Sequence, residues 1–449
     1  MSVRKIFGTD GVRGLANKGA LSPNNILKLA QAVSSHFIQG EHKHRVVIGK
    51  DTRLSGYMIE PALTAGFISM GMDVILVGPL PTPAIAMLTR SLRADLGVMI
   101  SASHNPFEDN GLKFFNAHGL KLDDCVEKEI ENIFSSNLIP KTLPAFLGHA
   151  QRLDDAQGRY IEYLKNAFPK NLTLENLHIV LDCANGAAYK VAPTVFWELG
   201  ATVTTINANP NGLNINNKCG ATNTKELEEK VKELKANIGI ALDGDADRVI
   251  FVDENGKTIH GDHLMGSIAS AWKDEGKLAS NSVVGTIMCN KGLEEYLSSI
   301  GIALHRSNVG DRYVSKYMSD KKSNLGGEPS GHIIMSDYTT TGDGILSALQ
   351  LLAYLLNNKK QASSIHHLFN LFPQGWLNIN CADKLILETP ETRKILADFK
   401  NLYKEKAHII IRPSGTEPLI RITVQAKTQD LVDEALISAE KCLKSIIQS

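Results

Sequence analysis

Short apolar runs, polar glycine-containing turns and amphipathic segments follow one another in a repeated order along the chain. Three apolar runs, at residues 46–48, 179–181 and 283–284, each lead into such a turn. A helical segment then ends near a glycine, and a second β-branched run follows at once. Strands and helices that alternate in this way predict mixed or parallel sheets with helices on both faces.

Each of the three units also contains a glycine-bearing segment dense in polar residues. These segments lie at residues 97–106, 239–248 and 326–332. Ligands of open α/β sheets bind at the carboxyl ends of the strands. We therefore expect the three segments to line one cleft.

The C-terminal part of the chain has a different pattern. Apolar runs at residues 409–411 and 420–424 precede an amphipathic helix from about Asp430, which predicts a small α+β unit. The predicted fold class is α/β, with three related mixed α/β domains and a smaller C-terminal α+β domain around a central cleft. The predicted domains are 1–155 with the serine segment, 156–254 with the acidic segment, 255–369 with a sugar-binding segment, and 370–449 with a phosphate-binding segment.

Composition narrows the class of protein. The 449 residues are 43% hydrophobic, and the 48 Lys and Arg balance the 48 Asp and Glu. A chain without net charge has no general attraction to nucleic acid or anionic lipid. The longest apolar stretch, residues 345–356, is too short to span a bilayer, and no signal peptide is recognised. Six cysteines without a CxxC pair are typical of a reducing compartment, so we expect a cytoplasmic protein with no membrane or nucleic-acid partner.

The strongest chemical signal is the segment from Asp243 to Arg248. If it is extended, Asp243, Asp245 and Asp247 lie on one side, and three carboxylates with room for water suit Mg²⁺. An EF-hand calcium loop is the competing interpretation, because Glu254 falls at its twelfth position. Arg248 stands where that loop needs a sharp turn, however, and an apolar run follows. A solvated acidic loop is the third interpretation, and the metal site is favoured.

A serine and histidine pair closes the apolar run at residues 97–100. Ser103 precedes His104, but the GxSxG elbow of many hydrolases is absent. Ser101 or Asn105 could simply cap a turn before a proline. The acidic segment, however, occupies the equivalent position in the next unit. We therefore favour a serine that carries a phosphoryl group near the metal.

Two further segments suit a phosphorylated sugar. Arg412 and Arg421 flank hydroxyl residues and Gly415, a composition that favours an anion cradle over a plain loop. Glu328 and Ser330 alternate with small or rigid residues, so both can face the hydroxyl groups of one ligand. Other polar residues near predicted strand ends are weak signals alone: Asp10, Arg13, Lys50, Arg53 and Lys113.

Taken in order, these motifs resemble the α-D-phosphohexomutase superfamily. The match includes the opening segment 7–14, the serine segment, the DGDADR and GEPSGH segments and the closing RPSGTEP segment. Residues 209–216, 219–220 and 339–344 resemble its amino-sugar branch. The resemblance implies a heart-shaped protein of four domains around a central cleft.

The resemblance also implies roles for individual residues. Ser103 is expected to be a phosphoserine at rest, and one Mg²⁺ per chain is expected on its phosphate and on Asp243, Asp245 and Asp247. Glu328 and Ser330 match the residues that bind sugar hydroxyls. The residues implied in catalysis, beside Ser103, are His104, Lys113, Arg13 and His332. The other residues implied in substrate binding are Arg248, Arg412, Ser414, Gly415, Thr416 and Arg421.

The implied activity is that of an isomerase acting on an amino-sugar phosphate. It would interconvert glucosamine 6-phosphate and glucosamine 1-phosphate through a 1,6-bisphosphate, and so supply UDP-N-acetylglucosamine for the cell wall. The chain is expected to be a monomer or a homodimer. Two alternatives stay open: a phosphomannomutase or phosphoglucomutase with the same mechanism, and a sugar-phosphate-binding or Ca²⁺-binding protein without catalysis.

Overall fold

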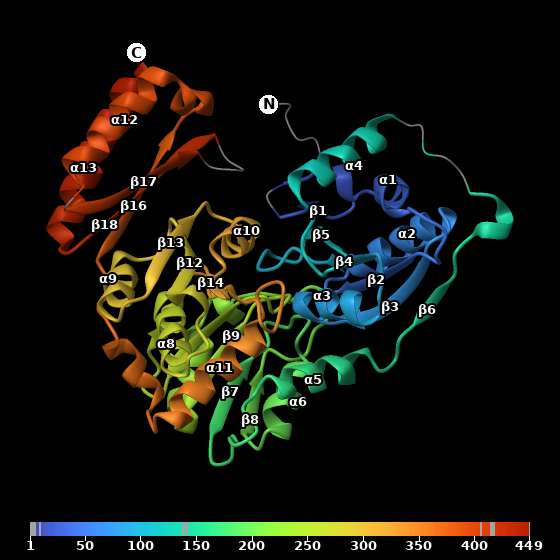
Figure 1. Cartoon of the computed structure of the whole chain (residues 1–449), viewed down its shortest axis with the longest axis horizontal. Helices are drawn as coiled ribbons and strands as arrows, with labels where there is room; N and C mark the ends of the chain where they lie inside the picture. Colours follow the sequence, from blue (N-terminus) through green and yellow to red (C-terminus); the bar gives the residue numbers. More distant parts are fainter. Residues whose placement is uncertain are drawn as a thin grey trace.

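Four β-sheets follow one another along the chain in the computed structural model, which describes residues 6–8, 10–136, 139, 142–404, 406–413 and 418–448. In Figure 1 they form an arc, with the first sheet (blue) and the fourth (orange to red) at its two ends. Three sheets are mixed and helix-covered, and the last is antiparallel. The predicted fold class is confirmed.

The first sheet has the strand order β1-β5-β4-β2-β3-β6. Strands β2, β3, β4 and β6 are parallel, whereas β5 is antiparallel to β4 and β1 is antiparallel to β5. The strands are β1 (Val12–Leu15), β2 (Arg45–Lys50), β3 (Asp73–Pro79), β4 (Leu96–Ile100), β5 (Asp109–Asn116) and β6 (Ala150–Arg152). The helices are α1 (Pro23–Phe37), α2 (Gly56–Ser69), α3 (Thr82–Ser91) and α4 (Asp124–Ser136).

The second sheet has the order β11-β10-β9-β7-β8, and the third has the order β13-β12-β14-β15. The second comprises β7 (His178–Asp182), β8 (Thr202–Ile206), β9 (Ile238–Leu242), β10 (Val249–Asp253) and β11 (Thr258–Ile259), with α5 (Ala156–Asn166), α6 (Val191–Glu198) and α7 (Lys225–Leu234). The third comprises β12 (Ser282–Thr286), β13 (Ala303–Ser307), β14 (Leu325–Gly327) and β15 (Ile333–Met335), with α8 (Gly261–Asp274), α9 (Lys291–Ser299), α10 (Asp311–Lys321) and α11 (Gly344–Asn357).

The first three sheets repeat one topology. Three parallel strands stand in the order third, first, second, namely β4-β2-β3, β9-β7-β8 and β14-β12-β13. An antiparallel fourth strand then pairs with the third: β5, β10 and β15. The serine, acidic and GEPSGH segments each connect the third strand to the fourth. The sequence repeat is therefore a repeat of structure, and the three polar segments are topologically equivalent loops.

The C-terminal sheet is antiparallel in the order β16-β18-β17. The expected strands and final helix are β17 (Ala407–Pro413), β18 (Leu419–Ala426) and α13 (Gln429–Gln448). Sequence reasoning did not identify β16 (Gln374–Asn380) or α12 (Pro390–Leu402). The short apolar stretches of β16 are interrupted by exposed polar residues, because only part of this edge strand is buried.

One hydrophobic core connects the first three sheets. It includes Val47 and Met99 of the first sheet, Leu181 of the second and Val283 of the third, with most of the apolar helix α11. A continuous core of this kind holds the three equivalent loops in fixed positions. The C-terminal domain has its own core and contacts the third domain where the Lys291 N–H donates to Gln425 Oε1 at 3.0 Å.

The apolar helices and the cysteines bear on the expectations drawn from composition. Among the described residues, no helix is both long and apolar enough to cross a membrane. All six cysteines are free thiols, and four of them are buried.

Candidate active site

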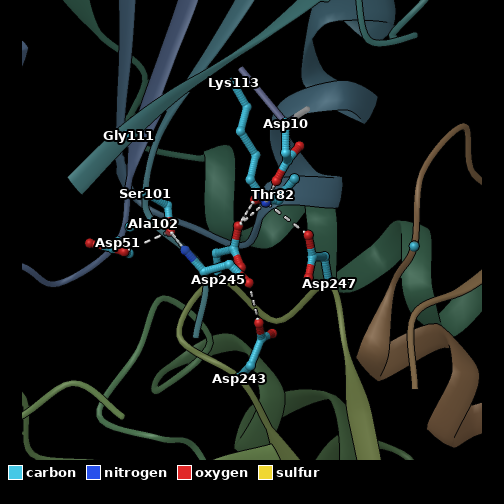
Figure 2. Close-up of polar contacts among 12 residues, drawn as sticks. Asp10, Asp51, Thr82, Ser101, Ala102, Gly111, Lys113, Asp243, Asp245 and Asp247 are labelled. Atoms are coloured by element: carbon cyan, nitrogen blue, oxygen red, sulfur yellow. Dashed lines mark hydrogen bonds and ion pairs between the residues drawn. The ribbon is translucent and has the colours of Figure 1, made fainter. Parts of the chain in front are cut away.

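The serine loop begins directly after β4 and is held in an unusual backbone conformation. Ser103 has φ +52°, a left-handed value that costs a non-glycine residue on the order of 1 kcal/mol. Its N–H donates to Ser101 Oγ at 2.9 Å, and that hydroxyl donates to Asp51 Oδ2 at 2.7 Å (Figure 2). Ser101 therefore supports the loop, while Ser103 presents its own hydroxyl to the next domain.

A buried guanidinium fixes the same loop. Arg53 pairs with Asp51 through Nε at 2.8 Å, and its Nη2 donates to the carbonyls of Ser103 and Asn105, each at 2.9 Å. Asn216 of the second domain donates through Nδ2 to the same two carbonyls, at 2.8 and 3.0 Å. The strained backbone at Ser103 is thus stabilised from two domains.

The acidic loop is a turn and not an extended segment, which corrects the sequence prediction. Strand β9 ends at Leu242, the Ala246 N–H donates to the Asp243 carbonyl at 3.0 Å, and Ala246 has φ +55°. The three carboxylates still converge, because the turn folds them inward: one oxygen from each lies within 4.8 Å of the others. Gly244 permits this approach, since a Cβ there would lie 2.5 Å from the Ser103 carbonyl oxygen.

Lys113 reaches from β5 into the carboxylate cluster, as Figure 2 shows. Its Nζ lies 2.7 Å from Asp245 Oδ2 and 2.9 Å from Asp247 Oδ2. Burial opposes the charge of this ammonium, but the carboxylates of Asp10, Asp245 and Asp247 outweigh burial and hold the pKa of Lys113 well above its usual value. The Thr82 hydroxyl also donates to Asp245.

The carboxylate cluster has the properties of a divalent-cation site. Asp245 Oδ1 and Asp247 Oδ1 are buried and accept no hydrogen bond from any described residue. Burial, followed by the charges of Asp247 and Asp245, raises the pKa of Asp243 to about 7. Three carboxylate oxygens that converge within 4.8 Å form a hard oxygen ligand set, which suits a cation such as Mg²⁺. The residues present therefore fit a bound divalent metal.

Ser103 and the carboxylate cluster are in direct contact. The Ser103 hydroxyl donates to Asp243 Oδ2 at 2.6 Å. His104 Nδ1 lies 3.5 Å from Ser103 Oγ and 3.1 Å from Arg248 Nη1. Burial and the positive charges of Arg248 and Arg13 lower the pKa of His104 to about 4, so its ring is neutral near pH 7.

A second polar network lies on the other side of the cluster. His332 is buried between Asp247, 3.7 Å from its Nδ1, and Asp311, 3.5 Å from its Nε2. Burial opposes protonation of this ring, but the two carboxylates raise the pKa of His332 above its usual value. Lys121 donates to Asp311 Oδ2 at 2.5 Å and also contacts Asp10. Arg13 pairs with Asp10 as well, so its charge is directed toward the cluster.

The residues expected to bind the sugar and the distal phosphate line one cavity between the third and fourth domains. This cavity of about 520 Å³ is lined by Glu328, Ser330, Arg412 and Arg421, among others. Ser330 Oγ donates to Glu328 Oε2 at 3.3 Å. Burial and the neighbouring Arg421 lower the pKa of Arg412 from its usual value, yet the group stays charged near pH 7. The two guanidinium groups face the same space as the sugar-loop carboxylate.

Most predicted site residues therefore gather in two adjoining places. The first contains Ser103, His104, Arg13, Lys113, Arg248, His332 and the three aspartates; the second contains Glu328, Ser330, Arg412 and Arg421. Ser414, Gly415 and Thr416 lie outside the described residues. Lys50 lies outside both places, because its Nζ pairs with Glu60 at 2.6 Å. Sequence reasoning gave no site role to Thr82, Asn216, Lys121 or Asp311, and only the chain position of Asn216 within a motif could have indicated it.

Comparison with known families gives a match along nearly the whole chain. Models of phosphoglucomutase/phosphomannomutase alpha/beta/alpha domains I, II and III match residues 4–139, 158–256 and 260–372, and the C-terminal domain model matches residues 377–436.

Similar proteins and structures agree with the domain models. The phosphoglucosamine mutase of Parvibaculum lavamentivorans is 54% identical over 430 residues, 96% of either chain, and that of Zymomonas mobilis is 53% identical over 433 residues, 96% of this chain and 97% of its own. A family protein from Burkholderia thailandensis has the same fold, with a TM-score of 0.85 at 22% identity over 99% of this chain and 98% of its own. Aspergillus fumigatus N-acetylphosphoglucosamine mutase, solved with GlcNAc-6P and magnesium, has a TM-score of 0.68 at 15% identity over 98% and 96%. The chain therefore belongs to the phosphoglucomutase/phosphomannomutase family, and it aligns over nearly its whole length with that family's phosphoglucosamine mutases.

Proposed function

We propose that the protein is a phosphoglucosamine mutase, an isomerase that interconverts glucosamine 6-phosphate and glucosamine 1-phosphate. The observation that carries this proposal is the contact between the Ser103 hydroxyl and Asp243, at 2.6 Å, beside a cavity that holds two arginines and a carboxylate. A serine placed in this way suits a phosphoryl carrier. The close relatives named for this activity support the choice of an amino sugar.

In the proposed reaction, phosphorylated Ser103 donates its phosphoryl group to the free hydroxyl of the sugar phosphate. The bond between Ser103 Oγ and phosphorus breaks, and a bond to the sugar oxygen forms. The sugar hydroxyl gives its proton to a base, for which His104 and His332 are candidates, and Ser103 Oγ takes up a proton as it leaves. The product is glucosamine 1,6-bisphosphate. After the sugar turns end over end, its other phosphoryl group returns to Ser103.

Cationic side chains stabilise the charge of the transferred group. Lys113, Arg13 and Arg248 all lie within the network that surrounds Ser103 and the aspartates. Phosphoryl transfer depends mainly on positioning and on charge stabilisation, and a buried site makes each charge more effective. The carboxylates that raise the pKa of His332 would stabilise the positive charge that its ring gains on accepting a proton.

We further propose that the metal is one Mg²⁺ per chain, bound by Asp243, Asp245, Asp247 and an oxygen of the Ser103 phosphate. When bound, this ion would neutralise charge on the phosphate and polarise it for transfer. The buried Oδ1 atoms of Asp245 and Asp247, which accept no hydrogen bond from a described residue, support this ligand set.

The cavity between the third and fourth domains would hold the part of the sugar that is not reacting. Glu328 and Ser330 would bind sugar hydroxyls, and Arg412 and Arg421 would bind the distal phosphate with Ser414, Gly415 and Thr416. Because the sugar must bind in two orientations, charge-based contacts suit this cavity better than a tight fit. Arg248 is electrostatically coupled both to the aspartates and to this cavity, because, against the opposing effect of burial, the carboxylates of Asp247, Asp243 and Glu328 all raise its pKa.

The finer assignments belong to the same proposal. We place the enzyme in the cytoplasm as a monomer or homodimer that supplies amino-sugar precursors of the cell wall, and the free cysteines support that location. The division into domains at 1–155, 156–254, 255–369 and 370–449 is likewise proposed. The residue ranges of the first and fourth sheets support the first and last boundaries, whereas β11 of the second sheet lies just beyond the boundary at 254.

The test compares kcat/KM for glucosamine, glucose and mannose phosphates, with Mg²⁺ and a trace of the matching 1,6-bisphosphate. We expect at least about a 100-fold preference for the glucosamine substrate. If the site hydrogen-bonds the amino group, a sugar without that group leaves polar atoms of the protein unpaired. A preference for glucose or mannose phosphate would assign the same machinery to another sugar. No turnover of any of them by protein phosphorylated at Ser103 would overturn the proposal.

A further inference from the structure

Two histidines and an aspartate gather at the end of the first sheet that lies opposite the active site. His42 and His44 precede β2, and Asp95 precedes β4. These two strands are parallel neighbours, paired from Val46 and Leu96 onward. Ser103 follows the far end of β4, so at about 3.3 Å per residue the cluster lies roughly 20 Å from it.

The contacts within this cluster leave one imidazole without a hydrogen bond. His42 Nε2 lies 2.7 Å from Asp95 Oδ1, and His44 Nδ1 lies 3.5 Å from the same oxygen. The rings of His42 and His44 are 4.1 Å apart between centroids. His44 is only 6% exposed, yet neither of its ring nitrogens forms a hydrogen bond with any described residue. A buried polar group in this condition carries a free-energy cost unless a ligand satisfies it.

The carboxylate of the cluster is already oriented. Asp95 Oδ2 accepts the Arg45 N–H at 2.8 Å, which leaves Oδ1 directed toward the two histidines. Such a second hydrogen bond is typical of carboxylates that bind metals, because it fixes the orientation of the ligand.

From this geometry we propose that His42, His44 and Asp95 form a binding site for a divalent transition-metal ion of the zinc type. One ligand atom from each residue lies within 4.8 Å of the others, and tetrahedral zinc with bonds near 2.0–2.1 Å needs ligand atoms about 3.4 Å apart. Small side-chain rotations are enough, since the His42 side chain is 60% exposed. Imidazole ligands favour zinc, nickel or cobalt over magnesium.

Solvent has access to the proposed site. A cavity of about 520 Å³ is lined by His42 and His44 together with Glu41 and residues of the segment 142–146. Water in this cavity can supply the remaining ligand positions. The bound ion would join the start of β2 to the turn before β4, and would stabilise the folded state by mass action without contact with the substrate.

The test is a zinc titration of the full-length protein in excess Mg²⁺, read by competition with a chromophoric zinc chelator. The variants are His42→Ala and Asp95→Asn, neither of which removes a buried apolar side chain. His149→Ala is the matched control, because this nearby exposed histidine contacts Asp73 and lies outside the cluster. We expect one zinc site in wild type and in the control, an affinity lower by about tenfold or more in both cluster variants, and unchanged mutase turnover in all.

A second readout separates a metal site from a general loss of structure. Cobalt(II) bound by wild type should give a visible absorption band that His42→Ala lacks, while the thermal unfolding midpoint without metal stays the same in both. Equal zinc affinity in wild type and His42→Ala, or an equal loss in His149→Ala, would overturn the proposal.

Discussion

The side chain of Arg53 offers a sharp test of how the serine loop is positioned. It is 1% exposed and donates hydrogen bonds to the carbonyls of Ser103, Asn105 and Asp109 as well as to Asp51. Arg53→Met keeps much of the side-chain volume but removes the charge and all of these donors. Five acceptors then lose this donor in a buried environment, because Arg53 also donates to the Pro106 carbonyl; the carbonyls of Ser103 and Asn105 keep Asn216 as a donor.

The expected magnitude follows from that environment. Removal of one partner from a buried ion pair costs about 3–5 kcal/mol, since the other charge stays buried and unpaired. We therefore expect the free energy of local opening of residues 101–111 to fall by that amount. The left-handed Ser103 would also lose one of its two supports, and a displacement of about 1 Å at a reacting atom lowers rates about 100-fold. The kcat should fall about 100-fold, whereas KM should stay constant because Arg412 and Arg421 are untouched.

Two measurements together check this prediction. Hydrogen exchange followed by mass spectrometry on peptides covering residues 101–111 gives the opening free energy, and steady-state kinetics give kcat and KM. Arg152→Met is the control, because Arg152 is an exposed arginine on β6 of the same sheet. An Arg53→Met protein with wild-type kcat and an opening free energy within about 0.5 kcal/mol of wild type would refute the reasoning.

Three further predictions concern the nucleophile, the distal phosphate and a contact between domains. Ser103→Ala should abolish turnover, whereas Ser101→Ala removes two supporting hydrogen bonds of up to about 1 kcal/mol each and should lower kcat only about 5- to 30-fold, as measured in the coupled mutase assay. Arg412→Ala should raise KM about 10- to 100-fold, because one charge-assisted contact of about 1.5–3 kcal/mol is lost. Arg312→Met removes the ion pairs between α10 and α4 and should lower the free energy of unfolding in urea by about 1.5–3 kcal/mol.

The controls for these variants come from the same chain. Arg393 is 64% exposed and pairs with the exposed Glu388, so Arg393→Ala should change neither KM nor stability. Equal loss of kcat in the two serine variants would contradict the assignment of Ser103. An unchanged KM in Arg412→Ala would contradict its role in phosphate binding, and unchanged unfolding of Arg312→Met would show that its ion pairs contribute nothing.

Local patterns were sufficient to predict the repeat and its functional loops. The segments 97–106 and 239–248 each contain the end of a strand, β4 or β9, followed by a polar loop, because strand periodicity and turn residues are encoded within a few neighbouring positions. The three aspartates are close in sequence, so their convergence could be predicted even though the assumed extended geometry was wrong. The same turn brings Gly244 against the Ser103 carbonyl, a close approach between two loops that no local pattern contains.

Residues that reach the site across long sequence separations could not be predicted. Asn216 contacts a carbonyl 113 residues away, and Thr82 contacts an aspartate 163 residues away. A single asparagine or threonine has no local signature of such a role, since only the packing of the domains brings the partners together. The same holds for Lys121 and Asp311, which meet across 190 residues.

The most direct test of the central claim follows the phosphoryl group on Ser103 through one turnover. Protein phosphorylated at Ser103 is mixed with glucosamine 6-phosphate and Mg²⁺ in a rapid-quench experiment, and both the phosphopeptide and the sugar products are quantified. The proposed function predicts that the phosphoryl group leaves Ser103 at least as fast as kcat and that glucosamine 1,6-bisphosphate appears in equal amount. A phosphoryl group that stays on Ser103 while the substrate is converted, or that passes only to water, would contradict it.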